Sequence, residues 1–389
     1  MVGAMKREAK ITERVLHFKQ PAGTSRGVYT ERRIWLVELS DGERVGVGEC
    51  APLPDLSCDA GLGYAATLRR FCDEWERCDG NDDAMERLFE QMRDYPSMLF
   101  GLETAMLSLQ SSHLSLLTSH LSPLTSHLSP FTSHFSPLTS HLLFDTPFSR
   151  GEEGIPINGL VWIGSHDEML ERLEQKLDQG FRCVKLKVGA IDFEQELDLV
   201  KRIRKRFSHH VVELRLDANG GFSNNDSQQD GGHGTEAALY KLELLSQYAI
   251  HSIEQPIRQG QWAYMAELCR DSPLPIALDE ELIGVNDAEM KSHLLSVIKP
   301  AYIVLKPSLH GGMRGCREWI GAARQHGIGS WMTSALESNI GLNAIAQFCS
   351  DVYGNGITMP QGLGTGQLFT DNIPMPLEVR GDQLWRMRN

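Results

Sequence analysis

Two lysines interrupt the apolar residues 181–189, which lie between two segments with helical spacing. We interpret 181–189 as a buried strand of a parallel sheet, whose alternate side chains point to opposite faces. Lys185 and Lys187 then share one face, where burial and mutual repulsion lower at least one pKa. A lysine with a near-neutral pKa can remove a proton from carbon. The alternative is that both side chains snorkel to water from an edge strand.

Three acidic residues stand at the ends of other apolar segments. Asp217, Glu254 and Asp279 each follow a short segment that reads as a strand. Because the carboxyl ends of parallel strands meet at one edge, these carboxylates converge and require a cation. Oxygen ligands suit a hard divalent ion, so we predict Mg²⁺, with Mn²⁺ as the alternative. Taken singly, each acid could instead cap a helix or close a turn.

A third lysine, Lys306, ends the next strand-like segment and lies roughly across the predicted site from Lys187. A carboxylate substrate bound to the metal has a more acidic α-proton, because the dication stabilises the developing enediolate. One lysine can remove this proton, while the opposite one stabilises negative charge or protonates the other face. The residues therefore predict proton abstraction next to a carboxylate.

The strands that position these residues belong to a repeating pattern. From residue 155 onward, apolar segments alternate with amphipathic ones such as 168–177 and 194–207, at spacings of about 25 to 40 residues. This spacing is typical of a β/α barrel, whose functional residues lie at the carboxyl ends of its strands. The predicted strands are 155–162, 184–188, 211–216, 250–253, 275–278, 302–305, 329–333 and 356–359. The polar stretch 224–235 is predicted to be a loop.

The first 110 residues have a different pattern. Strand-like segments at 11–18, 33–39 and 44–49, with Asp41-Gly42 as a hairpin turn, precede helical spacing over 61–109. Strands followed by helices indicate a separate α+β unit. Residues 21–27 are predicted to be a loop, which could be a mobile lid or an inert connector.

A low-complexity segment covers residues 111–143. It repeats the heptad Leu-Thr-Ser-His-Leu-Ser-Pro with small variations. Heptads are typical of coiled coils, but Pro123, Pro130 and Pro137 would break a helix. The regular histidines could bind a metal, yet such Ser/Thr/Pro-rich sequence need not fold. We expect a surface insertion at a domain boundary, without a role in catalysis.

Composition narrows the class of protein. The formal net charge of −13 over 389 residues argues against nucleic acid or an anionic membrane as partner. The sequence has no apolar run long enough to cross a bilayer, and residues 1–10 lack the apolar part of a secretory signal. We therefore expect a cytoplasmic protein with a small-molecule carboxylate substrate. Its eight cysteines show no CxxC spacing and are expected to be reduced. Oligomeric state is left open.

The charged motifs together resemble a known family. They are Lys185-Leu186-Lys187, Asp217-Ala218-Asn219, Glu254-Gln255-Pro256, Asp279-Glu280 and Lys306-Pro307. This set is similar to that of the muconate-lactonizing subgroup of the enolase superfamily, over nearly the whole chain apart from the repeat. The resemblance implies an α/β fold: a modified (β/α)7β TIM-like barrel with an α+β capping domain. The cap would comprise residues 1–110 and about 360–389, and the barrel 144–359.

Residue roles follow from the resemblance, position by position. It implies Asp217, Glu254 and Asp279 as Mg²⁺ ligands, Lys187 as the base, Lys306 as the opposite lysine and Lys185 as the residue that tunes Lys187. The implied substrate-binding residues are Thr24, Ser25, Arg26, Asn219, Ser334, Glu337 and Ser338. The first three would close over the substrate, with Arg26 as a candidate partner for a carboxylate.

Further stretches, 48–54, 158–162, 334–338 and 362–366, resemble one branch of this subgroup, which acts in menaquinone biosynthesis. The implied reaction is the Mg²⁺-dependent syn-dehydration of 2-succinyl-6-hydroxy-2,4-cyclohexadiene-1-carboxylate through a metal-stabilised enediolate. Lys187 would remove the α-proton and then protonate the departing hydroxide, while Lys306 holds the enediolate by charge. The repeat has no counterpart in the family pattern, and the loop 224–235 is longer than expected.

Two other functions stay open. An N-acylamino acid racemase or dipeptide epimerase of the same subgroup would use the same metal and both lysines, one on each face of the substrate. The stretches 48–54 and 334–338 favour dehydration over this alternative. A catalytically silent barrel acting as a scaffold would gain nothing from burying two lysines beside three carboxylates.

Overall fold

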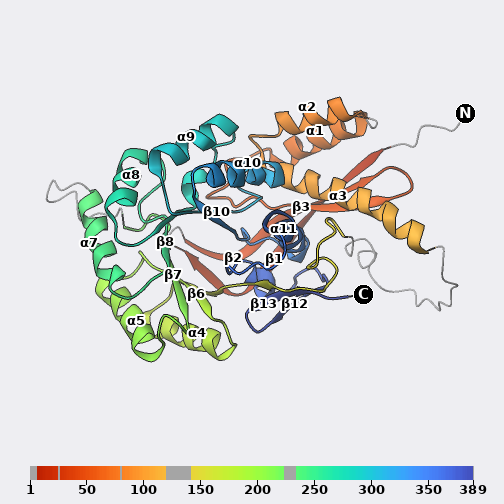
Figure 1. The fold of residues 1–389 in the computed structure, drawn as a ribbon. Coiled ribbons are helices and arrows are strands. Elements are labelled where there is room, and N and C mark those ends of the chain that lie inside the picture. The colour runs from red at the N-terminus through yellow and green to blue at the C-terminus, as the bar shows by residue number, and fades with distance from the viewer. Residues whose placement is uncertain (1–6, 25–26, 79–80, 120–141, 223–233, 389) are drawn as a thin grey trace, which may run out of the picture.

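The computed structural model describes residues 7–24, 27–78, 81–119, 142–222 and 234–388 (Figure 1). The chain forms an antiparallel sheet with its own helices, followed by a curved parallel sheet with helices outside it. The α/β fold with a barrel-like sheet and an α+β cap, predicted from the sequence, is confirmed. Within the described ranges, we find no helix that combines the length and apolar character needed to cross a bilayer.

The cap begins with a three-stranded antiparallel meander. Its strands β1 (Glu8–Thr24), β2 (Gly27–Ser40) and β3 (Val45–Cys50) pair in chain order. Helices α1 (Tyr64–Arg77), α2 (Asp82–Gln91) and α3 (Pro96–Ser119) follow, so the predicted order of strands before helices is correct. The loop predicted at 21–27 is mostly strand, because residues 22–24 pair with residues 27–29 and lengthen the β1–β2 hairpin.

The cap sheet is buried on both faces because its apolar residues alternate. Trp35, Val37 and Leu39 of β2 pack against α1 and α3. Ile34 and Leu36 point the other way and pack against Leu309, Ala335, Leu336 and Ile340 of the barrel domain. The period-two pattern of β2 therefore fixes which side of the cap faces the barrel.

The barrel sheet contains seven parallel strands in chain order. They are β5 (Gly159–Val161), β6 (Cys183–Lys187), β7 (Glu213–Asp217), β8 (Ser252–Glu254), β9 (Ile276–Leu278), β10 (Tyr302–Leu305) and β11 (Gly329–Met332). The helices between them are α4 (His166–Asp178), α5 (Phe193–Arg206), α7 (Gly234–Ser246), α8 (Trp262–Asp271), α9 (Ala288–Ile298), α10 (Gly312–Gln325) and α11 (Asn339–Tyr353). Short 3₁₀ turns occur at η1 (Glu280–Leu282) and η2 (Gly364–Gln367).

The strand predicted at 356–359 is wrong. These residues are irregular, and the ring is completed by Gln361 and Gly362, which form isolated parallel bridges to Ile157 and Thr333. Gly354 and Gly356 have positive φ angles, and Pro360 lacks a backbone N–H, so the apolar residues between them cannot continue a ladder. Two bridging residues thus occupy the place of an eighth strand.

The end of the chain returns to both parts of the molecule. β12 (Leu377–Arg380) pairs with β13 (Gln383–Arg386), and β13 pairs with β4 (Ile155–Pro156), so the predicted strand 155–162 is divided between two sheets. Phe369 bridges Phe18 of β1.

α3 continues to Ser119, so the start of the 111–143 segment is helical, and the repeat prolines lie outside the described residues. Most of the predicted loop 224–235 also lies outside them.

The cap domain is joined to the barrel by a buried carboxylate. Glu49, in β3, has 0% exposed surface and accepts hydrogen bonds from the backbone N–H groups of Ser338 and Gly341, both 2.8 Å away, at the start of α11. The Ser338 hydroxyl also donates to Glu49. Burial, with repulsion from Glu337, outweighs these bonds and raises the pKa of Glu49 to about 7.

Glycines allow β3 to pack directly on α3. A Cβ atom on Gly48 would lie 1.9 Å from the carbonyl oxygen of Gly101. We predict that Gly48→Ala lowers the free energy of unfolding by about 1 to 3 kcal/mol or more through overpacking. As a control, Gly321→Ala in α10 meets nothing within 4 Å and should change stability by less than about 1 kcal/mol. Urea unfolding of both variants tests this, and equal stabilities would contradict the packing account.

The raised pKa of Glu49 predicts a pH-dependent stability. The folded state holds the Glu49 proton more tightly than the unfolded chain does. The contribution of Glu49 to the free energy of unfolding therefore falls by about 3 kcal/mol as pH rises from about 4.5 to 7. Glu49→Gln removes this titration. The unfolding free energy of wild type minus that of the variant should therefore decrease by about 3 kcal/mol between about pH 4.5 and pH 8. A difference that does not change with pH would contradict the assignment.

Candidate active site

The charged residues singled out in the sequence gather at one edge of the barrel sheet. Lys185 and Lys187 lie on β6, and Asp217 and Glu254 end β7 and β8. Asp279 and Lys306 directly follow β9 and β10. β6 is an interior strand paired with both β5 and β7, so the edge-strand alternative for the two lysines is excluded. Parallel pairing in register brings these strand ends together.

The three acids form a compact buried cluster. Asp217, Glu254 and Asp279 each have 0% exposed surface, and one carboxylate oxygen from each lies within 4.8 Å of the others. Glu254 Oε1 and Asp279 Oδ1 accept no hydrogen bond from any described residue, although both are buried. Asp279 also makes no side-chain cap to the turn that follows it. Buried acceptors left open in this way are suited to a divalent cation.

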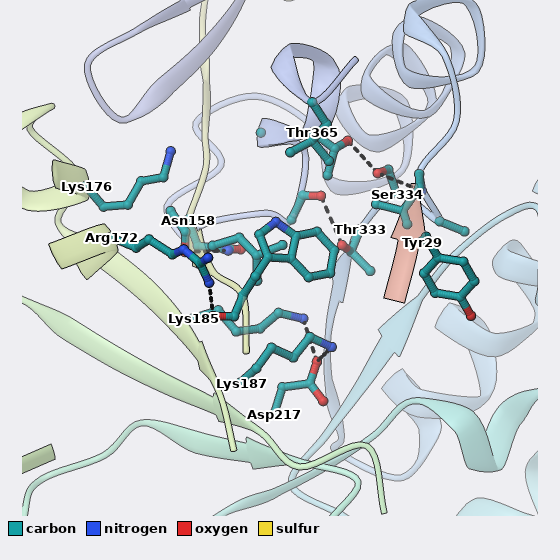
Figure 2. A pocket seen from close by; sticks show the side chains of 18 of the residues that line it. Tyr29, Asn158, Arg172, Lys176, Lys185, Lys187, Asp217, Thr333, Ser334 and Thr365 are labelled. Atoms are coloured by element: carbon teal, nitrogen blue, oxygen red, sulfur yellow. Dashed lines mark hydrogen bonds and ion pairs between the residues drawn. The ribbon is translucent and has the colours of Figure 1, made fainter. Parts of the chain in front are cut away.

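Each of the three lysines contacts this cluster. Lys185 Nζ lies 2.8 Å from Glu254 and 3.2 Å from Asp217. Lys187 Nζ lies 2.6 Å from Asp217 and donates to Asn219 Oδ1 at 2.6 Å. Lys306 Nζ lies 2.6 Å from Asp279. Figure 2 shows Lys185 and Lys187 extending toward the same Asp217 carboxylate.

The site separates the pKa values of its lysines. Burial lowers the pKa of Lys187, and the nearby charges of Lys185 and Lys306 lower it further against the attraction of Asp217. Burial also opposes the charged form of Lys185, but Glu254, Asp217 and Asp279 outweigh it and raise that pKa. The pKa of Lys306 is raised in the same way: burial opposes its charged form, but the attraction of Asp279 outweighs this effect. Lys187 is therefore the lysine whose proton is held least tightly.

The same charges act on the acids. Burial raises the pKa of Glu254 to about 8, with repulsion from Asp217 and Asp279, while Lys185 opposes this shift. Asp217 moves the other way, because the attraction of Lys187 and Lys185 overcomes burial and lowers its pKa. The ammonium groups thus hold the negative charge of Asp217 in place, whereas Glu254 holds a proton more tightly than a free glutamate does.

A cavity of about 240 Å³ lies between the cap and this edge of the barrel. Lys185, Lys187, Asp217 and Lys306 line it from the barrel, and Gln20, Tyr29, Leu53 and Leu56 line it from the cap. In the view of Figure 2, Thr333, Ser334 and Thr365 lie on one side of the cavity, and Arg172 and Lys176 on the other. The lysines and Asp217 therefore face the same cavity as residues of the cap.

The predicted substrate-binding residues fall into three groups. Asn219 and Ser334 line the cavity, and Asn219 also donates to Glu280. Glu337 and Ser338 lie outside the cavity lining, where Glu337 accepts from the Ser308 hydroxyl and the Ala335 N–H, and Ser338 bonds to Glu49. The side chain of Thr24, and Ser25 and Arg26 entirely, lie outside the described residues.

Other cavity residues carry no sequence signal of their own. Arg172 and Lys176 are one turn apart on α4, a spacing that any amphipathic helix shows. Tyr29 comes from the cap, so its place in the cavity depends on how the two domains dock. Trp162 and Thr365 fall within the motif stretches 158–162 and 362–366, but they stand out only after those stretches are matched to a family.

Two family sequence models match the chain. The model described as "MenC, N-terminal domain" covers residues 7–109, and the model described as "Enolase C-terminal domain-like" covers residues 168–381. The first match coincides with the cap strands and helices, and the second contains β6 to β11 with all three acids and all three lysines.

Individual relatives agree with these matches. The chain is 45% identical to an o-succinylbenzoate synthase from Desulfotalea psychrophila, over 95% of this chain and 96% of that protein. It superposes on the crystal structure of MenC from the same organism with a TM-score of 0.75 and 38% identity, covering 98% and 99% of the two chains. An L-Ala-D/L-Glu epimerase from Bacillus subtilis is 28% identical over 49% of this chain and 48% of its own length. With near-complete coverage at this identity, the chain belongs to the o-succinylbenzoate synthase family of the enolase superfamily.

Proposed function

We propose that this enzyme dehydrates 2-succinyl-6-hydroxy-2,4-cyclohexadiene-1-carboxylate to 2-succinylbenzoate in menaquinone biosynthesis. Family membership supports the reaction, since the relative from Desulfotalea psychrophila is named for its product. The observation in the site that carries the proposal is a pair of lysines on one acidic cluster: the buried Lys187 bonds Asp217, and the partly buried Lys306 bonds Asp279. This arrangement supports proton removal next to a carboxylate.

Lys187 is the base in this proposal. Its lowered pKa favours a neutral amine, which takes the α-proton of the substrate. A syn elimination places the leaving hydroxyl on the same face, so the ammonium just formed at Lys187 returns its proton to the departing hydroxide, and water leaves. No other proton donor is required, and the amine is neutral again at the end of the cycle.

The two other lysines keep their charge and act electrostatically. The raised pKa of Lys306 keeps an ammonium opposite Lys187, where it stabilises the negative charge that develops on the substrate. The pKa of Lys185 is also raised, so this residue keeps its charge and lowers the pKa of Lys187 by repulsion. The different charge states of neighbouring lysines thus support their different roles.

The acidic cluster fits a hard dication. Asp217, Glu254 and Asp279 would hold Mg²⁺, with Mn²⁺ as the alternative, and the bound ion would draw charge from the substrate carboxylate and acidify the adjacent proton. The open oxygens Glu254 Oε1 and Asp279 Oδ1 support this assignment. We also propose a cytoplasmic location, because the formal net charge of −13 argues against an anionic membrane surface as a partner.

Racemisation or epimerisation is the second candidate. Lysines on two sides of one site would suit proton removal from one face and return to the other, and part of the chain is similar to an L-Ala-D/L-Glu epimerase. Incubation with N-acylated amino acids and dipeptides in deuterated buffer separates the two functions. An epimerase exchanges the α-protons of both enantiomers with solvent, and a dehydratase has no need to.

The dehydration has a direct assay. Purified protein with Mg²⁺ should convert the hydroxy-cyclohexadiene carboxylate to its aromatic product, followed by ultraviolet absorbance. We predict that Lys187→Ala lowers kcat by about 10³-fold or more, because the α-proton then has no base. The control Lys201→Ala, an exposed position on α5, should retain activity within about twofold. Absence of the aromatic product with wild type would contradict the proposed function.

The acidic cluster can be tested by metal binding without turnover. We predict that wild type binds one Mn²⁺ per chain at the acidic cluster, measured by electron paramagnetic resonance of the free ion. Asp279→Asn should weaken this binding by about 100-fold or more, because a neutral amide replaces a buried carboxylate ligand. Glu378→Gln, on the exposed part of β12, is the matched control and should bind as wild type does. Equal affinities for both variants would exclude the cluster as the metal site.

A further inference from the structure

The cavity wall formed by residues 333–336 is held in an unusual backbone conformation. Thr333, Ser334, Ala335 and Leu336 line the cavity after β11. Leu336 has a φ of 64°, in the left-handed region that a leucine rarely adopts. Something outside the segment must therefore maintain this conformation, since it is unfavourable for the residue itself.

Contacts within the barrel hold the N–H groups of this wall. The Leu336 N–H donates to the Ser334 hydroxyl at 3.4 Å, and the Ala335 N–H donates to Glu337 at 2.7 Å. Glu337 in turn accepts from the hydroxyl of Ser308, two residues after Lys306. The wall is thereby connected to the turn that carries one of the active-site lysines.

The carbonyl groups of the wall point to the cap instead. Arg32 of β2, only 2% exposed, donates from Nε to the Leu336 carbonyl at 3.2 Å and from one terminal nitrogen to the Ala335 carbonyl at 3.3 Å. These groups are about 300 residues apart in the chain, so the contact exists only when the cap is docked.

The same guanidinium holds the cap side of the cavity. It donates to the carbonyls of Ala51, Pro52 and Arg33, so its five N–H groups meet five backbone carbonyl oxygens. Leu53, directly after Pro52, lines the cavity. Among the described residues Arg32 forms no ion pair, although the charges of Glu337 and Glu49 favour its charged form. Its hydrogen bonds go to backbone acceptors on two walls at once.

We propose that Arg32 is a positioning residue: it sets the distance between the cap wall at 51–53 and the barrel wall at 335–336, and so fixes the cavity for the substrate. This inference rests on the proposed function for its substrate. Only arginine offers five donors in a planar fork, whereas lysine offers three on one nitrogen. Loss of the fork leaves buried carbonyls unpaired and releases the left-handed Leu336.

The test compares two arginines of the cap that bond to the barrel. Arg93 donates to Glu318 of α10 and to the Asn286 carbonyl, but does not line the cavity. Arg32→Met and Arg93→Met each remove the hydrogen bonds that an arginine of the cap makes to the barrel. Each variant keeps an unbranched side chain at the position. Thermal unfolding then measures how much each variant weakens the docking of cap on barrel. KM and kcat show whether the Arg32 variant also changes substrate binding.

We expect Arg32→Met to raise KM, and the Kd for 2-succinylbenzoate, by roughly tenfold or more, with kcat reduced by less than about threefold. Arg93→Met should leave KM, Kd and kcat within about twofold of wild type, with a smaller loss of thermal stability because the Arg93 side chain is 25% exposed. If Arg32→Met fails to fold, Arg32→Lys replaces it, with a smaller rise in KM and Kd in the same direction.

Two outcomes overturn the inference. One is a folded Arg32 variant with unchanged KM and Kd; the other is an Arg93 variant with the same rise, which would assign the effect to docking in general. Failure of the proposed function is distinct, because wild type itself would then neither turn over the hydroxy-cyclohexadiene carboxylate nor bind 2-succinylbenzoate.

Discussion

Repulsion among three buried carboxylates is the constraint on which the rest of the structure depends. Asp217, Glu254 and Asp279 are fully buried with oxygens within 4.8 Å of one another, a state that is unfavourable without positive charge beside it. Lysines from β6 and from the end of β10 supply part of that charge. The parallel strands pair in register, and this pairing brings the acids and lysines at the strand ends to one edge of the sheet. The charges of the site therefore depend on how the sheet pairs.

The cap covers the cavity, whereas the three acids and three lysines of the site come from the barrel. Its sheet is apolar on both faces, and Tyr29 of β2, with Leu53 and Leu56 after β3, lines the cavity from the side that meets the barrel. Two buried charged residues, Glu49 and Arg32, connect the cap to the residues that follow β11. Because residues 333–336 form a wall of the cavity, the shape of the cavity depends on how the cap docks.

The convergence of the charged residues could be predicted from the sequence because Lys187, Asp217, Glu254, Asp279 and Lys306 each stand at a strand end or directly after one, which is a local feature. Lys187 and Asp217 needed only the alternation of a strand and the rule that parallel ends converge. The strand predicted at 356–359 failed because glycines and a proline override its apolar residues. Arg32 could not be found, since it precedes an apolar strand segment and its partners Ala335 and Leu336 are far along the chain. Glu337 and Ser338 were associated with substrate, but their contacts are with Ser308 and Glu49.

We propose that one dication is held by acids from three successive strands, with an amine on each side. A crystal structure with Mn²⁺ and 2-succinylbenzoate, with anomalous data, tests it most directly. We expect one anomalous peak bonded to an oxygen each of Asp217, Glu254 and Asp279, with the Nζ atoms of Lys187 and Lys306 facing opposite sides of the bound product. A peak elsewhere, or lysines on the same side or turned away from the product, would contradict it.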